Sequence, residues 1–135
     1  MKTLRFSPSK DLIFVKGSVH GLHHRAGRRV QLVLDTGAAE TIIVPDLLDE
    51  LGYSARDGES IVTMRSAAGR EQGYLIRVAR FKALGHQARD FRVHVQDLPE
   101  GWGIEGLIGL SFLHQFNYEV RSQEGRIRVE RVGTR

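Results

Sequence analysis

Apolar residues recur at every second position over much of the chain. The clearest runs are Val30, Leu32 and Leu34; Tyr74, Ile76 and Val78; Phe91, Val93 and Val95 against Arg92 and His94; and Ile127 with Val129. Such alternation is typical of strands with one buried face. Glycines suited to hairpin turns separate the runs, among them Gly69, Gly85 and Gly125. The pattern predicts an all-β protein folded as a small closed barrel.

Two segments favour short helices instead. One spans residues 45–52, where Pro45 suits the first helical position and Gly52 can end the helix. The other begins at Ser111, a good N-cap, and its spacing puts Phe112 and Phe116 on one face. We therefore expect one or two short helices packed on the barrel.

Length and composition predict one domain. The chain has 135 residues, 41% of them hydrophobic, which supports one core but not two. We expect a single domain over residues 1–135, with flexible ends at about 1–10 and 132–135. No apolar run is long enough to span a bilayer, and the first residues lack the apolar core of a signal peptide, so we expect a soluble cytoplasmic protein without a membrane partner.

Other chemistries are disfavoured by the residue inventory. There is no cysteine, which excludes disulfides, thiolate zinc sites and cysteine nucleophiles. The net charge of +4 comes from scattered Lys and Arg, and with 7% aromatic residues we expect no nucleic-acid partner. His20, His23 and His24 have no carboxylate close by in sequence, so we expect no metal and no other cofactor.

The segment of greatest chemical interest follows the run Val30 to Leu34. This strand ends abruptly in Asp35, Thr36 and Gly37, which would hold a carboxylate at the end of a rigid element. The tripeptide by itself favours a simple turn after a strand over a catalytic site. Neither Ser18 nor Ser111 lies in the sequence context of a serine nucleophile.

The longer string Leu32-Val33-Leu34-Asp35-Thr36-Gly37-Ala38-Ala39-Glu40-Thr41-Ile42-Ile43 resembles the active-site segment of the retropepsins, the retroviral type of aspartic protease. The string Gly106-Leu107-Ile108-Gly109-Leu110-Ser111-Phe112-Leu113 resembles the strand that precedes the C-terminal helix of these enzymes. Between them, residues 61–76 occupy the place of the flap hairpin. The resemblance covers most of the chain and implies a bacterial-type single-domain member.

The resemblance implies an aspartic endopeptidase that acts as a homodimer on a peptide or protein substrate. Peptide hydrolysis without a metal or a covalent intermediate needs one group that takes a proton from water and another that polarises or protonates the carbonyl. No other Asp of the chain has a comparable context, so each chain would supply one Asp35. Thr36, Gly37 and Ala38 would support the loop, and Ser66, Ala67, Ala68 and Gly69 would form the flap tip. Candidates for the substrate pocket are Ile42, Val44, Met64, Ile104 and Ile108, although each could instead belong to the core.

One departure from the viral pattern concerns the dimer. The viral enzymes have an Asp at the position of Ala39 that pairs with an Arg at the position of Leu110, and here both members are apolar. Losing both together leaves no uncompensated charge, but it changes the expected dimer contact. The alternative function is a non-catalytic dimeric module that binds peptides or proteins on the same fold.

Overall fold

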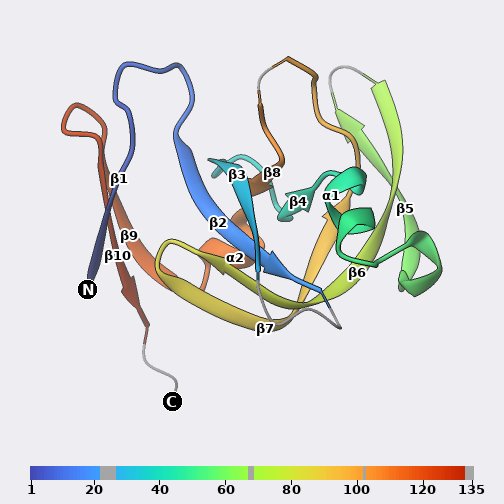
Figure 1. Cartoon of the computed structure of the whole chain (residues 1–135). Helices are drawn as coiled ribbons and strands as arrows, with labels where there is room; N and C mark the ends of the chain where they lie inside the picture. The colour runs from blue at the N-terminus through green and yellow to red at the C-terminus, as the bar shows by residue number, and fades with distance from the viewer. Residues whose placement is uncertain (22–26, 67–68, 102, 133–135) are drawn as a thin grey trace.

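The computed structural model describes residues 1–21, 27–66, 69–101 and 103–132, with the backbone alone over 62–72. Its strands are β1 (Lys2–Arg5), β2 (Phe14–His20), β3 (Arg28–Leu34), β4 (Ile42–Ile43), β5 (Ser60–Ser66), β6 (Gly69–Ala83), β7 (His86–Val95), β8 (Gly106–Ile108), β9 (Phe116–Arg121) and β10 (Arg126–Arg131). The helices are α1 (Pro45–Glu50), α2 (Leu110–Leu113) and the short 3₁₀ turn η1 (Ala55–Asp57). Figure 1 shows their arrangement.

Six strands close into a barrel. Their order is β2-β3-β8-β4-β7-β6, and β6 pairs again with β2 through Gly17 to His20, which closes the ring. β5 pairs with β6 outside the ring, and the two strands form a long hairpin that rises beside the barrel (Figure 1). The predicted small closed barrel with short helices is therefore confirmed.

The alternating runs fill the barrel as expected. At most 1% of the surface is exposed in each of Leu32, Ile76, Val93 and Ile127. Phe112 lies among them and contacts Phe81 and Phe91 edge to face, with ring centroids 5.1 and 5.7 Å apart. Burial of these large side chains is the main source of stability for a domain of this size.

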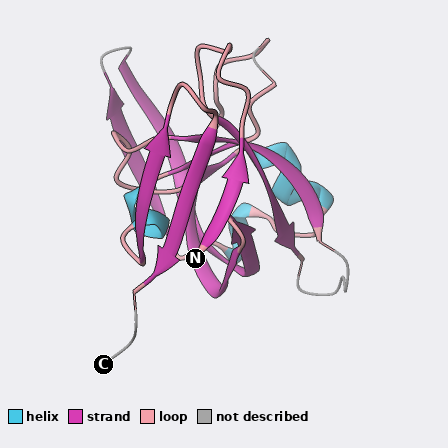
Figure 2. Cartoon of the chain, turned by 90° about the vertical axis from the view of Figure 1, so that its left-hand side faces the viewer, coloured by secondary structure: helices cyan, strands magenta, loops and turns pink. Residues whose placement is uncertain are grey.

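A second sheet of three strands contains the start of the chain. β1 pairs with β10, and β10 pairs with β9, all antiparallel. Figure 2 views the molecule from this side, where the N-terminal strand lies beside its partners. Within residues 1–10, which the sequence predicted to be flexible, Lys2–Arg5 form a strand paired with β10, and Leu4 packs against the core. Of the other predicted flexible end, 132–135, the structure describes only Val132.

The first helix agrees with the prediction, and the second differs from it. α1 begins at Pro45 and is followed by Gly52 at φ +87°. α2 is only four residues long, its N-cap is Gly109 rather than Ser111, and Phe116 already starts β9. Ser111 does not cap the helix because its hydroxyl group is used in hydrogen bonds to Thr41.

Candidate active site

Asp35 lies directly after β3, where the chain leaves the barrel. Its N–H donates to Ile108 O at 2.9 Å, which continues the pairing of β3 with β8 by one residue. Its carboxylate Oδ1 accepts the Gly37 N–H at 2.9 Å, and Ala38 N–H reaches Asp35 O at 3.3 Å. The carboxylate is therefore held in a tight turn at the end of a rigid strand, as the sequence predicted.

The tip of this loop faces solvent in the single chain. Asp35 and Ala38 are half-buried, whereas Thr36, Gly37 and Ala39 are exposed. Across the described residues, no second carboxyl group is hydrogen-bonded to Asp35. One chain therefore presents one carboxylate on an exposed turn.

The loop is anchored to the start of α2 by backbone bonds. Leu110 N–H donates to Ala38 O at 2.8 Å, and Ser111 N–H donates to Ala39 O at 2.9 Å. Gly109 makes this approach possible, because a Cβ at Gly109 would lie 2.2 Å from Glu40 O. The two strings that carried the family resemblance thus meet in space.

The hydroxyls of Thr41, which is buried, and Ser111, which is half-buried, complete the anchor. Thr41 is wholly buried, and its Oγ1 accepts the Gly109 N–H at 3.2 Å and the Ser111 hydroxyl at 3.1 Å. Ser111 Oγ in turn accepts the Thr41 N–H at 3.0 Å. The sequence pattern had predicted an N-cap role for Ser111 and not this one. The available signal was its position as a small hydroxyl residue two positions after Gly109.

The predicted flap corresponds to the β5–β6 hairpin. Ser66 pairs with Gly69, the last pair of this ladder that the structure describes. Ala67 and Ala68 lie outside the described residues, as does the side chain of the pocket candidate Met64. Trp102, His23 and His24 also lie outside the described residues.

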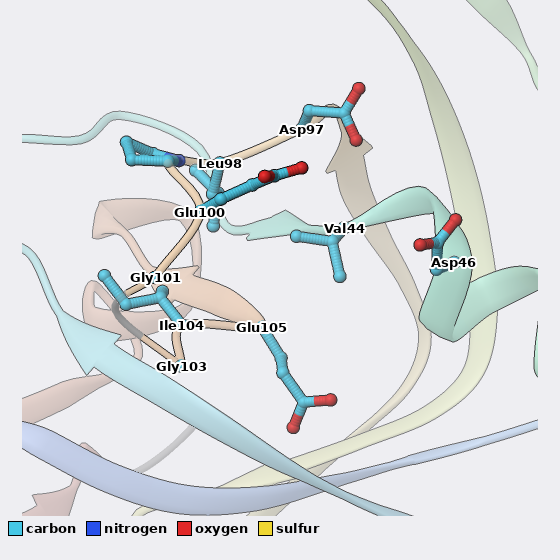
Figure 3. Close-up of a pocket in the computed structure, with 10 residues that line it drawn as sticks. Val44, Asp46, Asp97, Leu98, Glu100, Gly101, Gly103, Ile104 and Glu105 are labelled. Atoms are coloured by element: carbon cyan, nitrogen blue, oxygen red, sulfur yellow. The ribbon is translucent and has the colours of Figure 1, made fainter.

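Two of the pocket candidates line an open pocket of about 660 Å³ (Figure 3). Val44 and Ile104 are half-buried there, between the start of α1 and the loop that joins β7 to β8. Carboxylates share the walls: those of Asp46, Asp97, Glu100 and Glu105. Glu105 is partly neutralised by Arg28, whose Nη1 lies 2.6 Å from Glu105 Oε2.

The other two pocket candidates are buried. Ile108 belongs to the barrel core with no exposed surface, because strand alternation turns its side chain inward, and it is not a pocket wall. Ile42 is 3% exposed but lies outside the core cluster, on the opposite face of its strand from Ile43. Its neighbour across the sheet is His94, which the sequence pattern had placed on a solvated face and which is only 5% exposed.

Comparison with known proteins agrees with this geometry. The model of a family described as aspartyl protease matches residues 15–112, which includes the Asp35 loop, the flap hairpin and the anchor at Gly109. The chain belongs to this family. Membership accounts for why the Asp-Thr-Gly turn and the glycine string lie together in this fold.

Solved structures show the same fold at low sequence identity. A retropepsin-like aspartic protease from Rickettsia conorii superposes with a TM-score of 0.68 at 16% identity, covering 95% of this chain and 88% of that one. The EIAV protease, solved with the inhibitor HBY-793, superposes with a TM-score of 0.59 at 17% identity, covering 78% and 88%. No curated protein matches the sequence. The fold of this aspartyl protease family member is therefore that of the retropepsins.

None of the helices in the described part of the chain is long and apolar enough to cross a membrane.

Proposed function

We propose that this protein is an aspartic endopeptidase in which two copies of the chain, each a single domain over residues 1–135, pair to bring their Asp35 carboxylates together. The observation that carries the proposal is the Asp35 turn. Its carboxylate is fixed by the Gly37 N–H at the exposed end of β3, and its loop is anchored to α2 in a member of the aspartyl protease family.

The chemistry requires both carboxyl groups. Two carboxyls in close contact do not ionise together at low cost, so the pair shares one proton. The ionised Asp35 would take a proton from water as the water oxygen attacks the peptide carbonyl carbon, and the protonated Asp35 would give its proton to the carbonyl oxygen. One carboxyl group then gives its proton to the amide nitrogen while the other takes a proton from a hydroxyl of the tetrahedral intermediate, so the C–N bond breaks and the pair again holds one proton.

The remaining loop residues have supporting roles in this proposal. Thr36 is exposed beside Asp35, where its hydroxyl can bond the matching loop of the second chain. Gly37 has no side chain to keep an extended substrate away from the loop backbone. The peptide would lie as an added strand between the Asp35 loops and the β5–β6 hairpins, which cover it with the segment Ser66 to Gly69.

The test is cleavage of a diverse peptide mixture from mildly acid to neutral pH by the wild type and by Asp35→Asn. We expect the variant to lose about 10³-fold or more in rate, because groups that act as a unit fail together. Asp11→Asn, which changes an exposed acid in the loop before β2, is the matched control and should cleave normally. We also expect the cleavage rate to follow a bell-shaped pH profile. A doubly protonated pair has no carboxylate to accept the proton of water, and a doubly ionised pair has no proton to give to the carbonyl oxygen.

Cleavage that survives in Asp35→Asn would contradict the mechanism. Cleavage by neither protein, with dimers present in solution, would instead favour the dimeric binding module that hydrolyses nothing.

A further inference from the structure

One face of the barrel carries exposed cations from four neighbouring strands. β2 pairs with β3 on one side and with β6 on the other, and β6 pairs with β7. Ser18 of β2 lies between Arg29 and Lys82. On the next row of the sheet, Arg80 lies opposite Arg89. Paired residues, and residues two apart on one strand, point to the same face of a sheet. We use the name cationic face for the exposed residues Lys16, Arg29, Arg80, Lys82 and Arg89.

The cationic face has no carboxylate partners of its own. None of its five residues forms an ion pair with an acid in the described part of the chain, although carboxylates do pair with four other arginines: Arg28, Arg77, Arg92 and Arg121. The formal net charge of the chain is +4, so without these five cations it would be −1. The five residues are far apart in sequence, and the sheet brings them together. The excess positive charge of the chain is therefore accounted for by one face.

Folding does not account for this arrangement. Arg80 and Arg89 are directly opposite each other, and like charges in that position destabilise a sheet. All five side chains are exposed, so they add little to the burial that stabilises the core. Cations that gather on one face without acids between them attract a partner of opposite charge.

An open pocket of about 390 Å³ lies within the cationic face. Lys16, Arg29 and Lys82 line it, and the side chain of Ser18 lies between the last two because both pair with Ser18. The other lining residues are small or apolar: Gly17, Ala83, Leu84 and Gly85. No acid of the described residues lines this pocket. A carboxylate that enters it can accept hydrogen bonds from a guanidinium, an ammonium and a hydroxyl group together.

The cationic face is connected with the Asp35 turn through β3. Asp35 follows this strand directly, and Arg29 lies six residues earlier in the chain. Because the spacing is even, alternation points both side chains to the same side of the sheet. At about 3.3 Å per residue, the two positions are about 20 Å apart. A polypeptide cleaved at Asp35 would therefore reach Arg29 with residues about six positions from the cut.

We propose that the cationic face is an exosite, a binding surface outside the active site, for an acidic segment of the protein substrate that is rich in Asp and Glu. The inference rests on the proposed endopeptidase function and adds the substrate class. Four strands about 4.8 Å apart make the face about 14 Å wide, which suits several carboxylates of one extended segment. Binding there raises the local concentration of the bond to be cut at the Asp35 turn.

A nucleic acid fits the cationic face less well than an acidic polypeptide does. Proteins that bind single strands stack the bases on aromatic side chains. The uncharged residues that pair with the five cations include no Phe, Tyr or Trp: they are Ser18, His20, Gln31 and Gln87. An acidic polypeptide needs only the cations and the pocket.

The test uses a peptide that the wild type cleaves, extended by four Glu or four Gln residues after a spacer of two or eight residues. With the long spacer, we expect the Glu run to lower KM by about 10-fold relative to the Gln run and to leave kcat unchanged, because the added contact is the same before and during the reaction. With the short spacer the Glu run cannot reach the face, and KM should stay the same.

Charge reversal locates the effect on the molecule. The double variant Arg29→Glu with Lys82→Glu should abolish the gain from the Glu run and keep the wild-type rate on the unextended peptide. The matched control is Arg126→Glu with Arg128→Glu, which makes the same change in charge at exposed positions of β10 and should keep the gain.

A stability measurement separates binding from a role in folding. Arg89→Gln removes one of two opposed cations, so it should weaken the gain while its Tm stays unchanged or rises. A variant that loses the gain only together with a lower Tm would overturn the exosite. A Glu run without effect on KM at either spacer length, or a double variant that keeps the gain, would overturn it as well.

Direct binding keeps the exosite testable without cleavage. If the wild type cleaves nothing, the proposed function fails, and the Glu and Gln peptides are compared by fluorescence anisotropy. Tighter binding of the Glu peptide, lost in the double variant, would support the acidic-segment site by itself, and equal affinities would overturn it. Tighter binding of an oligonucleotide with the same number of charges would overturn it in favour of a nucleic-acid partner.

Discussion

At the scale of single residues, the Asp35 loop is fixed by groups from a distant part of the sequence. Thr41 and Ser111 exchange hydrogen bonds through their hydroxyls and the Thr41 N–H, and Thr41 also accepts the Gly109 N–H. Thr41 is wholly buried, so its own polar groups have no access to replacement water. A catalytic carboxylate must be held to within a fraction of an ångström, and this pair supports the loop that holds it.

Ser111→Ala should therefore lower both stability and activity. The change removes the Ser111 acceptor of the Thr41 N–H and leaves the Thr41 hydroxyl bonded, among the described residues, to the Gly109 N–H alone. We expect this to cost about 1–3 kcal/mol of the free energy of unfolding, measured by urea denaturation. Ser9→Ala is the control, because the exposed Ser9 hydroxyl bonds only the exposed Ser7 among the described residues and its loss should cost less than about 0.5 kcal/mol. Equal effects of the two changes would show that the pair of Thr41 and Ser111 does not support the loop.

At the scale of elements, β7 has two buried faces near its end. Val93 and Val95 point into the core, and His94 is buried on the other face. Arg92, two residues before His94 on the same face, is exposed, and its Nη2 lies 3.9 Å from Glu40 Oε1. This face of the strand therefore changes from exposed to buried within two residues. The burial of His94 is thus a property of what covers the sheet there and not of the strand itself.

This burial predicts a pH dependence of stability. Because burial lowers the pKa of His94 below its usual 6.5, the unfolded chain takes up a proton there before the folded chain does as the pH falls. The contribution of His94 to stability is therefore full above about pH 6.5 and declines as the pH falls toward its folded pKa. Burial lowers the pKa of His86 as well, which adds a contribution of the same sign.

The measurement is urea denaturation between pH 7.5 and 5 for the wild type and His94→Leu. The slope of the unfolding free energy against pH should be smaller in the variant, with the slope due to His86 remaining. An unchanged slope would mean that His94 titrates alike in the folded and unfolded chains.

At the scale of the whole molecule, the closed barrel leaves the proposed catalytic turn on its surface. Thr36, Gly37 and Ala39 are exposed in the single chain, and Leu110 behind them is half-buried. An exposed loop with one carboxylate is suited to contact a second copy across a two-fold axis, in which each loop meets its own equivalent. The apolar pair Ala39 and Leu110 would make this contact without a salt bridge.

Mixing experiments test the shared site. In an equimolar mixture of wild type and Asp35→Asn that has exchanged partners, about a quarter of random pairs contain two intact Asp35 residues. We expect activity at about a quarter of that of wild type at the same total concentration, while a mixture with Asp11→Asn keeps full activity. Activity at half would show that each chain works alone.

The sequence by itself determined the strand-rich barrel, the position of α1, the turn at Asp35 and the β5–β6 hairpin. These features depend on local alternation of apolar residues, on Pro45 and the turn glycines, and on one recognisable string of residues, all of which can be read within a short window. The family resemblance added the link between the Asp35 string and the string at Gly109, and the backbone bonds of Ala38 and Ala39 with α2 agree with it.

Only the tertiary structure decided which groups serve that turn and which side chains are covered. Ser111 is a residue type that favours the N-cap position, but its hydroxyl donates a hydrogen bond to Thr41, which is distant in sequence. Lys2–Arg5 form a strand because β10 lies alongside. Ile108 does not line a pocket because its side chain is enclosed in the barrel core. The alternation of apolar residues around His94 predicts a solvated position, and His94 is nevertheless buried. Burial and hydrogen bonding depend on contacts between residues far apart in sequence, and a local pattern carries no information about what lies on the other side of a strand.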